Sequence, residues 1–153
     1  MTIHWQLKSF QQLSTIELYQ IMKLRVDTFI VEQNCCYAEL DNKDQLEQTL
    51  HLFHQQNNEI AAYLRLMPNM PQSPNKVIIG RVIVNKSYRQ QGLGHQLMKE
   101  ALQQCQQLFP QQALILSAQA HLQNYYHQHG FHKHSEIYLE DGIPHVEMIK
   151  TVN

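Results

Sequence analysis

One unit of the chain limits its possible folds more than any other: a β-branched run, then a glycine turn, then a long amphipathic segment. The run from Val77 to Val84 is interrupted only by Gly80 and Arg81, which is typical of a central strand covered on both faces. The segment after the turn carries leucine and alanine at helical spacing until Pro110 ends it. A buried strand leading into an amphipathic helix predicts an α/β domain with a mixed sheet flanked by helices.

Further elements of this domain follow from residue patterns along the chain. Alternating or β-branched residues predict strands at 3–7, 50–54, 60–66, 114–118, 137–139 and 145–149, and one that starts at Phe131. Ser14 and Glu17 form a capping box, which predicts the start of a helix. Its buried side is expected to carry Leu18, Met22, Val26 and Phe29. A short helix at 122–129 is expected to end at Gly130.

Polar and Pro-containing stretches are expected to connect these elements. Residues 31–44 form a polar stretch with four carboxylates, which predicts a loop. Three prolines, Pro68, Pro71 and Pro74, predict an exposed loop before the central strand. Turn-forming pairs at 57–58 and 141–142 indicate tight connections between neighbouring strands.

The composition bounds the class of protein. A length of 153 residues suits one domain, which we expect to span residues 1–153. A formal net charge of -1 indicates neither a nucleic-acid partner nor an anionic membrane. No apolar run approaches the roughly 20 residues of a membrane helix, and the first ten residues lack the pattern of a signal peptide. We therefore expect a cytoplasmic location, with the three cysteines Cys35, Cys36 and Cys105 reduced.

The strongest chemical signal is the turn Arg89-Gln90-Gln91-Gly92-Leu93-Gly94 between the central strand and the long helix. A helix N-terminus presents unpaired N–H groups and a partial positive charge, and glycines let a phosphate approach the backbone. Arg89 adds a charged, bidentate donor. The turn is thus suited to a pyrophosphate, although the glycines alone would also fit an ordinary strand-to-helix connection.

A second block strengthens this interpretation. Tyr125-Tyr126-His127-Gln128-His129-Gly130-Phe131 follows the turn after one helix and one strand. Together the two blocks resemble the acetyl-CoA pyrophosphate motif and the Tyr-x-x-x-Gly-Phe motif of the GNAT family of N-acetyltransferases. The predicted element order agrees with that family along nearly the whole chain. Segments at 24–25, 29–33, 37–41, 118–120 and 142–148 look like the ElaA-type branch of GNAT proteins.

The resemblance implies a GNAT-type fold with a mostly antiparallel sheet, and acetyl-CoA as co-substrate. It implies that Tyr126 is the general acid that protonates the departing thiolate. Strand residues would bind the pantetheine arm and the thioester oxygen, and the turn would wrap the pyrophosphate through backbone amides. Gln119 stands where many family members have Asn. The cofactor-binding residues implied are Val82, Ile83, Val84, Arg89, Gln90, Gln91, Gly92, Leu93, Gly94, His95, Gln119 and Asn124.

The acceptor side is drawn from residue chemistry as well as from the resemblance. Glu32 and His145 are candidate catalytic bases, because a carboxylate or an imidazole can accept a proton near neutral pH. Arg25, Glu39 and Asp41 are candidate substrate residues, with Arg25 expected to pair with a nearby carboxylate. Asp44, His51 and Glu147 are further candidates. Any one of them can equally be a solvated surface group.

These observations predict an enzyme that transfers the acetyl group of acetyl-CoA to a primary amine by direct attack on the thioester. A non-catalytic acyl-CoA sensor, and an acetyltransferase acting on a protein N-terminus or lysine, remain as alternatives. The acceptor is thus a small-molecule or peptide amine, and a homodimer is possible for such folds. The histidines at 127, 129, 132 and 134 do not share one face and lack further ligands, so we expect no metal.

Overall fold

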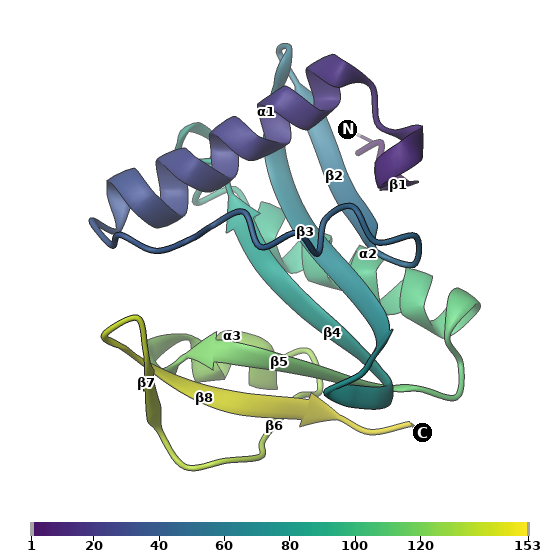
Figure 1. Ribbon diagram of the computed structural model, residues 1–153, viewed down its shortest axis with the longest axis vertical. Helices are drawn as coiled ribbons and strands as arrows, with labels where there is room; N and C mark the ends of the chain where they lie inside the picture. Colours follow the sequence, from purple (N-terminus) through teal and green to yellow (C-terminus); the bar gives the residue numbers. More distant parts are fainter. Residues whose placement is uncertain (1, 153) are drawn as a thin grey trace.

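The computed structural model describes residues 2–152, which form one eight-stranded sheet with helices on both faces (Figure 1). The strands are β1 Gln6–Ser9, β2 Leu50–Gln56, β3 Glu59–Met70, β4 Ser73–Val84, β5 Ala113–Gln119, β6 His132–Lys133, β7 Tyr138–Glu140 and β8 Ile143–Lys150. The helices are α1 Thr15–Arg25, α2 Leu93–Leu108 and α3 Gln123–His127, with short 3₁₀ turns at Phe10–Gln12, Lys86–Tyr88 and Ala120–Leu122. A π-helical segment, Val26–Glu32, continues α1.

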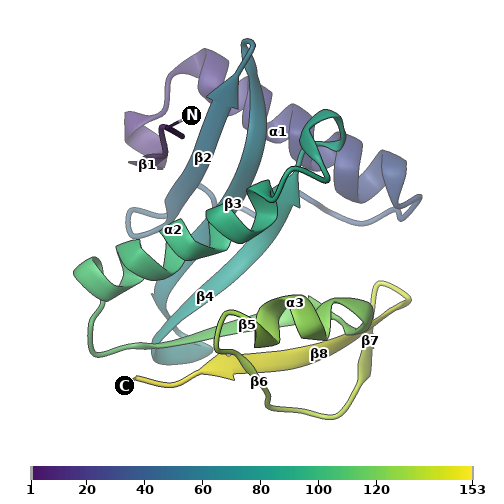
Figure 2. The same ribbon diagram turned by 180° about the vertical axis from the view of Figure 1, so that it is seen from behind.

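The sheet order is β1-β2-β3-β4-β5-β8-β6, and β7 also pairs with β8. Helix α1 crosses the face of β2 and β3 that is nearer in Figure 1, whereas α2 and α3 cover the opposite face (Figure 2). The larger core lies under α2, where Leu97, Met98 and Ala101 are fully buried against the sheet. A smaller core under α1 contains Ile21 and Tyr63. The predicted α/β class with a mixed, mostly antiparallel sheet is confirmed.

One junction in this sheet matters for function. Every strand pair is antiparallel except β4 with β5, which run parallel and pair only at residues 76–78 with 113–115. Beyond Ile78 the two strands diverge, and Figure 1 shows β4 and β5 opening away from their shared end. The second halves of both strands therefore leave a gap in the middle of the sheet.

Several predicted boundaries are wrong. The prolines do not form a loop, because β3 extends to Met70 and β4 begins at Ser73, so that only residues 71–72 turn. Pro68 pairs with Val77 beside a register shift, and such an irregularity accommodates a residue without an N–H donor. The first strand lies at 6–9 rather than 3–7. Three strands follow α3, as predicted, at 132–133, 138–140 and 143–150.

Helix α1 begins as predicted but buries a different side. The Ser14 hydroxyl accepts the Glu17 N–H at 3.0 Å, and the Glu17 carboxylate accepts the Ser14 N–H at 2.8 Å, which confirms the capping box. The buried residues are instead Glu17, Ile21, Leu24, Arg25 and Thr28. Val26 is 38% exposed. The buried stripe is thus shifted by one position from the predicted one, and Met22 and Phe29 are half-buried at its edge against the smaller core.

Candidate active site

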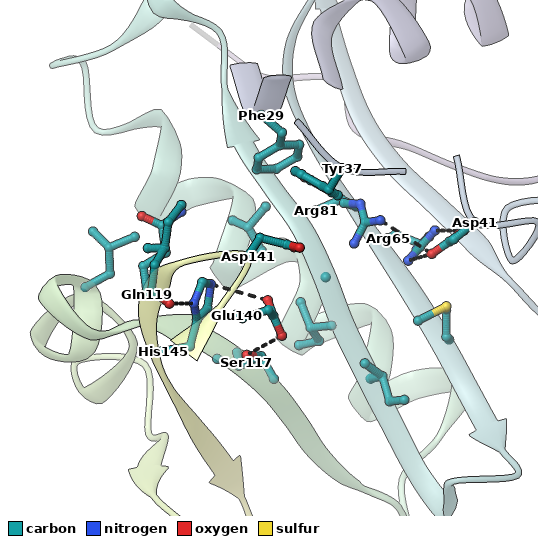
Figure 3. A pocket seen from close by; sticks show the side chains of 18 of the residues that line it. Phe29, Tyr37, Asp41, Arg65, Arg81, Ser117, Gln119, Glu140, Asp141 and His145 are labelled. Carbon is teal, nitrogen blue, oxygen red and sulfur yellow. Dashed lines mark hydrogen bonds and ion pairs between the residues drawn. The ribbon is translucent and has the colours of Figure 1, made fainter. Parts of the chain in front are cut away.

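The gap between β4 and β5 opens into a cavity of about 510 Å³ (Figure 3). One wall comes from β3 and β4, the other from β5, β7 and β8, and Phe29 and Tyr37 reach it from the segment after α1. A cavity of this size suits a small molecule or the reactive end of a larger one.

The glycine turn lies at the N-terminus of α2, beside the end of β4. Gly92 is the N-cap residue with a φ of 76°, and Gln90 also has a positive φ, of 65°. No side chain caps this helix. Within residues 2–152, no acceptor bonds the N–H groups of Leu93, Gly94 and His95, whereas the Gln96 N–H reaches the Gly92 carbonyl. The turn thus holds unpaired backbone donors at the positive end of a 16-residue helix, which is the donor set a pyrophosphate requires.

Arg89 does not present a free guanidinium to this turn. Its Nη1 and Nη2 atoms donate to the two carboxylate oxygens of Glu32 at 2.6 and 2.9 Å, and its Nε donates to the Val84 carbonyl at 2.9 Å. The hydrogen bonds from Arg89 lower the pKa of Glu32, which makes this carboxylate a weaker base. Glu32 is absent from the residues that line the cavity. Its contacts therefore place it beside the glycine turn, apart from Glu39 and Asp41.

A Glu32→Gln substitution tests this placement. For the CoA-dependent activity that the resemblance implies, we expect the kcat to change by no more than about twofold, since Glu32 lies outside the cavity. The affinity for CoA is expected to change more, since Arg89 is released toward the turn. Steady-state kinetics at several acetyl-CoA concentrations separate the two effects. A kcat that falls 100-fold with unchanged CoA affinity would restore Glu32 as the base.

Tyr126 lines the cavity from α3 and is 6% exposed. Burial raises the pKa of its phenol, so the hydroxyl stays protonated at neutral pH. No residue between 2 and 152 accepts or donates a hydrogen bond to that hydroxyl, which leaves the proton available to a ligand in the cavity. Tyr125 beside it donates to the Gly94 carbonyl at 2.5 Å and so ties α3 to the glycine turn.

The other predicted cofactor-binding residues lie in different places. Val82 and Gln119 line the cavity, Ile83 packs into the smaller core, and a Val84 methyl faces Gly94. The His95 Nδ1 lies 2.9 Å from the His129 Nε2 on the outer side of the turn. Asn124 is exposed on α3 and does not line the cavity.

His145 has a fixed tautomer. Its Nδ1 lies 2.7 Å from the Ile143 carbonyl, which can only accept, so Nδ1 carries the hydrogen and Nε2 bears the lone pair of the neutral ring. Nε2 lies 3.4 Å from a carboxylate oxygen of Glu140, and Figure 3 shows this pair facing the cavity. The Ser117 hydroxyl donates to the other Glu140 oxygen at 3.3 Å. His145 is thus placed to take up a proton that Glu140 would stabilise.

The three predicted substrate residues belong to a buried ion network that joins the segment after α1 to the sheet. The Arg25 Nε donates to Glu39 at 2.6 Å, and its Nη1 donates to Asp44 at 2.6 Å. Arg65 binds Asp41 at 2.9 Å and Asp44 at 3.0 Å. The members are Arg25, Arg65, Arg81, Glu39, Asp41 and Asp44, three cations and three anions. The predicted pairing of Arg25 is confirmed, but Arg25 is 0% exposed and cannot touch a substrate.

The remaining candidates lie outside the catalytic part of the cavity. His51 is fully buried, with Nδ1 2.7 Å from the Tyr63 hydroxyl and Nε2 3.1 Å from the Asp44 carbonyl. Glu147 lies 3.9 Å from His134 and does not line the cavity. Within residues 2–152, no three His, Cys, Asp or Glu side chains are grouped to hold a metal ion. Likewise, no helix in that range is long and apolar enough to cross a membrane.

The buried ion network makes the stability of the folded protein vary with pH in the acidic range. Burial raises the pKa of Asp41, but the hydrogen bonds and charge of Arg65 outweigh it and bring the pKa from 3.8 to about 2. A lowered folded-state pKa contributes stability above pH 3.8 that is lost as the pH falls toward 2. We expect Asp41 to account for a loss of about 2 kcal/mol in the free energy of unfolding across that window.

Urea unfolding at pH 5, 4, 3 and 2 measures this loss. Asp41→Asn removes the titrating group, so the variant starts less stable and its stability falls less steeply over the same range. A variant that parallels the wild type would show that Asp41 does not contribute to the pH dependence.

The profile of the acetyltransferase (GNAT) domain family matches residues 17–152 of this chain. The chain belongs to the GNAT acetyltransferase family. Protein ElaA of Escherichia coli (strain K12) is 40% identical over 150 residues, which cover 98% of this chain and 97% of that protein. The crystal structure of E. coli ElaA superposes with a TM-score of 0.90 at 39% identity, covering 97% of this chain and 99% of the other. An acyl-CoA N-acyltransferase from Pseudomonas aeruginosa superposes with a TM-score of 0.92 at 43% identity, covering 98% and 100%.

These similarities place the chain in the ElaA-like branch of the GNAT family and confirm the predicted fold. They support activity as an acyl-CoA-dependent N-acyltransferase. The sequence analysis did not identify Arg65, Arg81 and Glu140 as site residues, although all three line the cavity. The one local signal was Arg81, a charge that interrupts the β-branched run.

Proposed function

We propose that this GNAT protein is a single-domain N-acetyltransferase, spanning residues 1–153, that moves the acetyl group of acetyl-CoA to a primary amine. The observation that carries the proposal is the uncapped N-terminus of α2, which adjoins the end of β4 at Gly94 and is tied by Tyr125 to the helix that carries the cavity residue Tyr126. Donors for a pyrophosphate and an acid for a thiolate are thus arranged along one path. The backbone at 90–95 would hold the pyrophosphate, and that at 82–84 would hold the pantetheine arm.

The reaction follows from these positions. The amine nitrogen attacks the thioester carbonyl carbon, a C–N bond forms, and the C–S bond breaks. His145 Nε2 takes the proton that the amine loses, and Glu140, at 3.4 Å, stabilises the imidazolium. Tyr126 gives its phenolic proton to the departing sulfur and regains one from solvent, into which His145 releases the proton that it took up. His145 and Tyr126 thus act as base and acid from two walls of one cavity.

His145→Asn tests the base. Asparagine retains a donor for the Ile143 carbonyl but cannot take up a proton, so we expect the kcat to fall about 100-fold or more. Glu140→Gln keeps the shape of its partner without the charge and is expected to cost less, about tenfold. Thiol release from acetyl-CoA measures both, and unchanged turnover in His145→Asn would remove this residue from the mechanism.

The deciding experiment measures CoA binding and CoA release in one series. Free CoA at 100 times its Kd stabilises a protein by about 2.7 kcal/mol, which a thermal-shift assay detects. Saturable stabilisation with amine-dependent CoA release supports the enzyme. Stabilisation without release from any amine or peptide would favour a sensor. No stabilisation would contradict the cofactor assignment. A peptide acceptor, a homodimer and the cytoplasmic location stay predictions.

A further inference from the structure

Arg81 has a backbone conformation that a strand residue rarely adopts. Its φ is 54°, and the β3–β4 register shifts at this point, so that Tyr63 pairs with Ile83 while Arg65 pairs with Gly80. A bulge of this kind redirects a side chain, and a positive φ costs free energy for a residue with a Cβ. The bulge points the guanidinium of Arg81 into the cavity, where Figure 3 shows it beside Arg65.

The guanidinium of Arg81 is only partly used by the protein. Its Nε donates to the Glu39 carboxylate at 2.8 Å, and its Nη2 donates to the Glu39 backbone carbonyl at 3.1 Å and lies 3.4 Å from Asp41. Its Nη1 has no acceptor among residues 2–152, and the side chain is 22% exposed. The neighbouring Arg65 also leaves its buried Nε without an acceptor. The three arginines of the network thus bring more N–H donors than its three carboxylates accept.

The opposite wall of the cavity carries carboxylates instead of guanidinium groups. Glu140 and Asp141 lie there with His145, and all three line the cavity (Figure 3). Glu140 is 49% exposed, and its only cationic partner within residues 2–152 is His145, if that ring is protonated. One wall therefore offers a directed cationic donor, and the other offers carboxylates next to the proposed base.

We propose that the acceptor is an amino acid, a small molecule with a carboxylate and a primary amine. The proposal rests on the proposed function. The carboxylate accepts a charge-assisted hydrogen bond from Arg81 Nη1. The ammonium group is drawn to Glu140 and gives one proton to solvent, and the neutral amine then loses a second proton to His145 as it attacks. Since the ion network balances its own charges, recognition comes from the direction of this donor rather than from bulk attraction. A protein N-terminus or a lysine within a chain lacks the carboxylate and is a poor acceptor.

Matched acceptors test the inference without any mutation. Leucine, phenylalanine, serine, lysine and glutamate are each compared with their α-amides, using acetyl-CoA and thiol release. The amide has the more easily deprotonated amine, so simple reactivity favours it. We expect at least one free amino acid to have a kcat/KM tenfold or more above that of its amide. Amides equal to or better than every acid would overturn the inference and leave the acetyltransferase intact.

Variants assign the preference to Arg81. Arg81→Gln is expected to bring the acid-to-amide ratio of kcat/KM close to one, chiefly through a higher KM for the acid, and Arg81→Lys to restore part of it. Lys43→Gln removes another positive charge from the lining of the cavity and is expected to keep the ratio. A ratio retained in Arg81→Gln would overturn the inference.

CoA-induced thermal shifts accompany every variant and separate the two proposals. A wild type that binds CoA and acetylates simple amines but no amino acid contradicts only the acceptor class. A wild type that does not bind CoA contradicts the acetyltransferase itself. A fall in the melting temperature of Arg81→Gln without a change in the ratio would assign Arg81 to holding Glu39 alone.

Discussion

Tyr126→Phe is expected to lower the kcat by about 100- to 1000-fold while leaving the affinity for CoA within about twofold. General acid catalysis contributes roughly 10²–10⁴-fold, and here the acid is a phenol whose pKa is raised by burial and whose proton has no partner in the described chain. The ring itself stays, so its edge-on packing against Phe131 is retained. Single-turnover release of CoA, followed from pH 6 to 10, measures the loss.

Tyr125→Phe is the matched control, since it removes a hydroxyl from the adjacent position of the same helix. That hydroxyl binds the Gly94 carbonyl, so its loss should weaken CoA binding more than it slows the chemical step. The two variants should therefore separate, one in kcat and the other in CoA affinity. Equal effects on kcat in both would argue that Tyr126 acts through packing and not as an acid.

Arg25→Met is expected to reduce the free energy of unfolding by about 3–5 kcal/mol, because it leaves Glu39 and Asp44 with one guanidinium fewer in a buried site. The Arg25 side chain is 0% exposed, so water cannot replace the lost partner. Urea unfolding monitored by circular dichroism gives the free energy directly. The segment at 33–49 should also become more susceptible to proteolysis, since Arg25 holds Glu39.

Lys23→Met on the same helix provides the comparison. Lys23 forms an ion pair with Asp27 at 2.6 Å, but both side chains are more than half exposed, at 65% and 53%. Exposed pairs contribute about 0–1 kcal/mol, so this variant should change stability by less than 1 kcal/mol. A loss below 1 kcal/mol in Arg25→Met as well would mean that the network contributes little to folding.

The positions of the glycine turn and of Tyr126 were predictable from the sequence because the signals that indicate them are local. Gly92 lies between a buried strand and a helix, and the unpaired donors follow from that order of elements. Tyr126 lies a few residues before a glycine that ends its helix. In both cases, short-range geometry fixes where the group faces.

The acceptor side was not predictable because its partners are far apart in the chain. Arg25 lies 14 residues from Glu39, and Arg81 lies 42 residues from it, and no local pattern links them. The carboxylates looked like a cluster able to attract a cation, but folding pairs them with arginines. Glu140 gained its significance only when β7 and β8 formed a hairpin that brought it next to His145.

The divergence of β4 from β5 has a consequence for how the protein can change over time. Past Ile78, β4 pairs with β3 but has no strand partner on the side of β5, so main-chain groups on that side, other than the Val84 carbonyl that binds Arg89, can bind a ligand that itself carries amides. Such recognition does not depend on which side chain each residue carries. Under the proposed function, the half of the cavity that binds the acyl donor can therefore tolerate substitution, while substitutions at a few positions on the other half would change which amine is accepted.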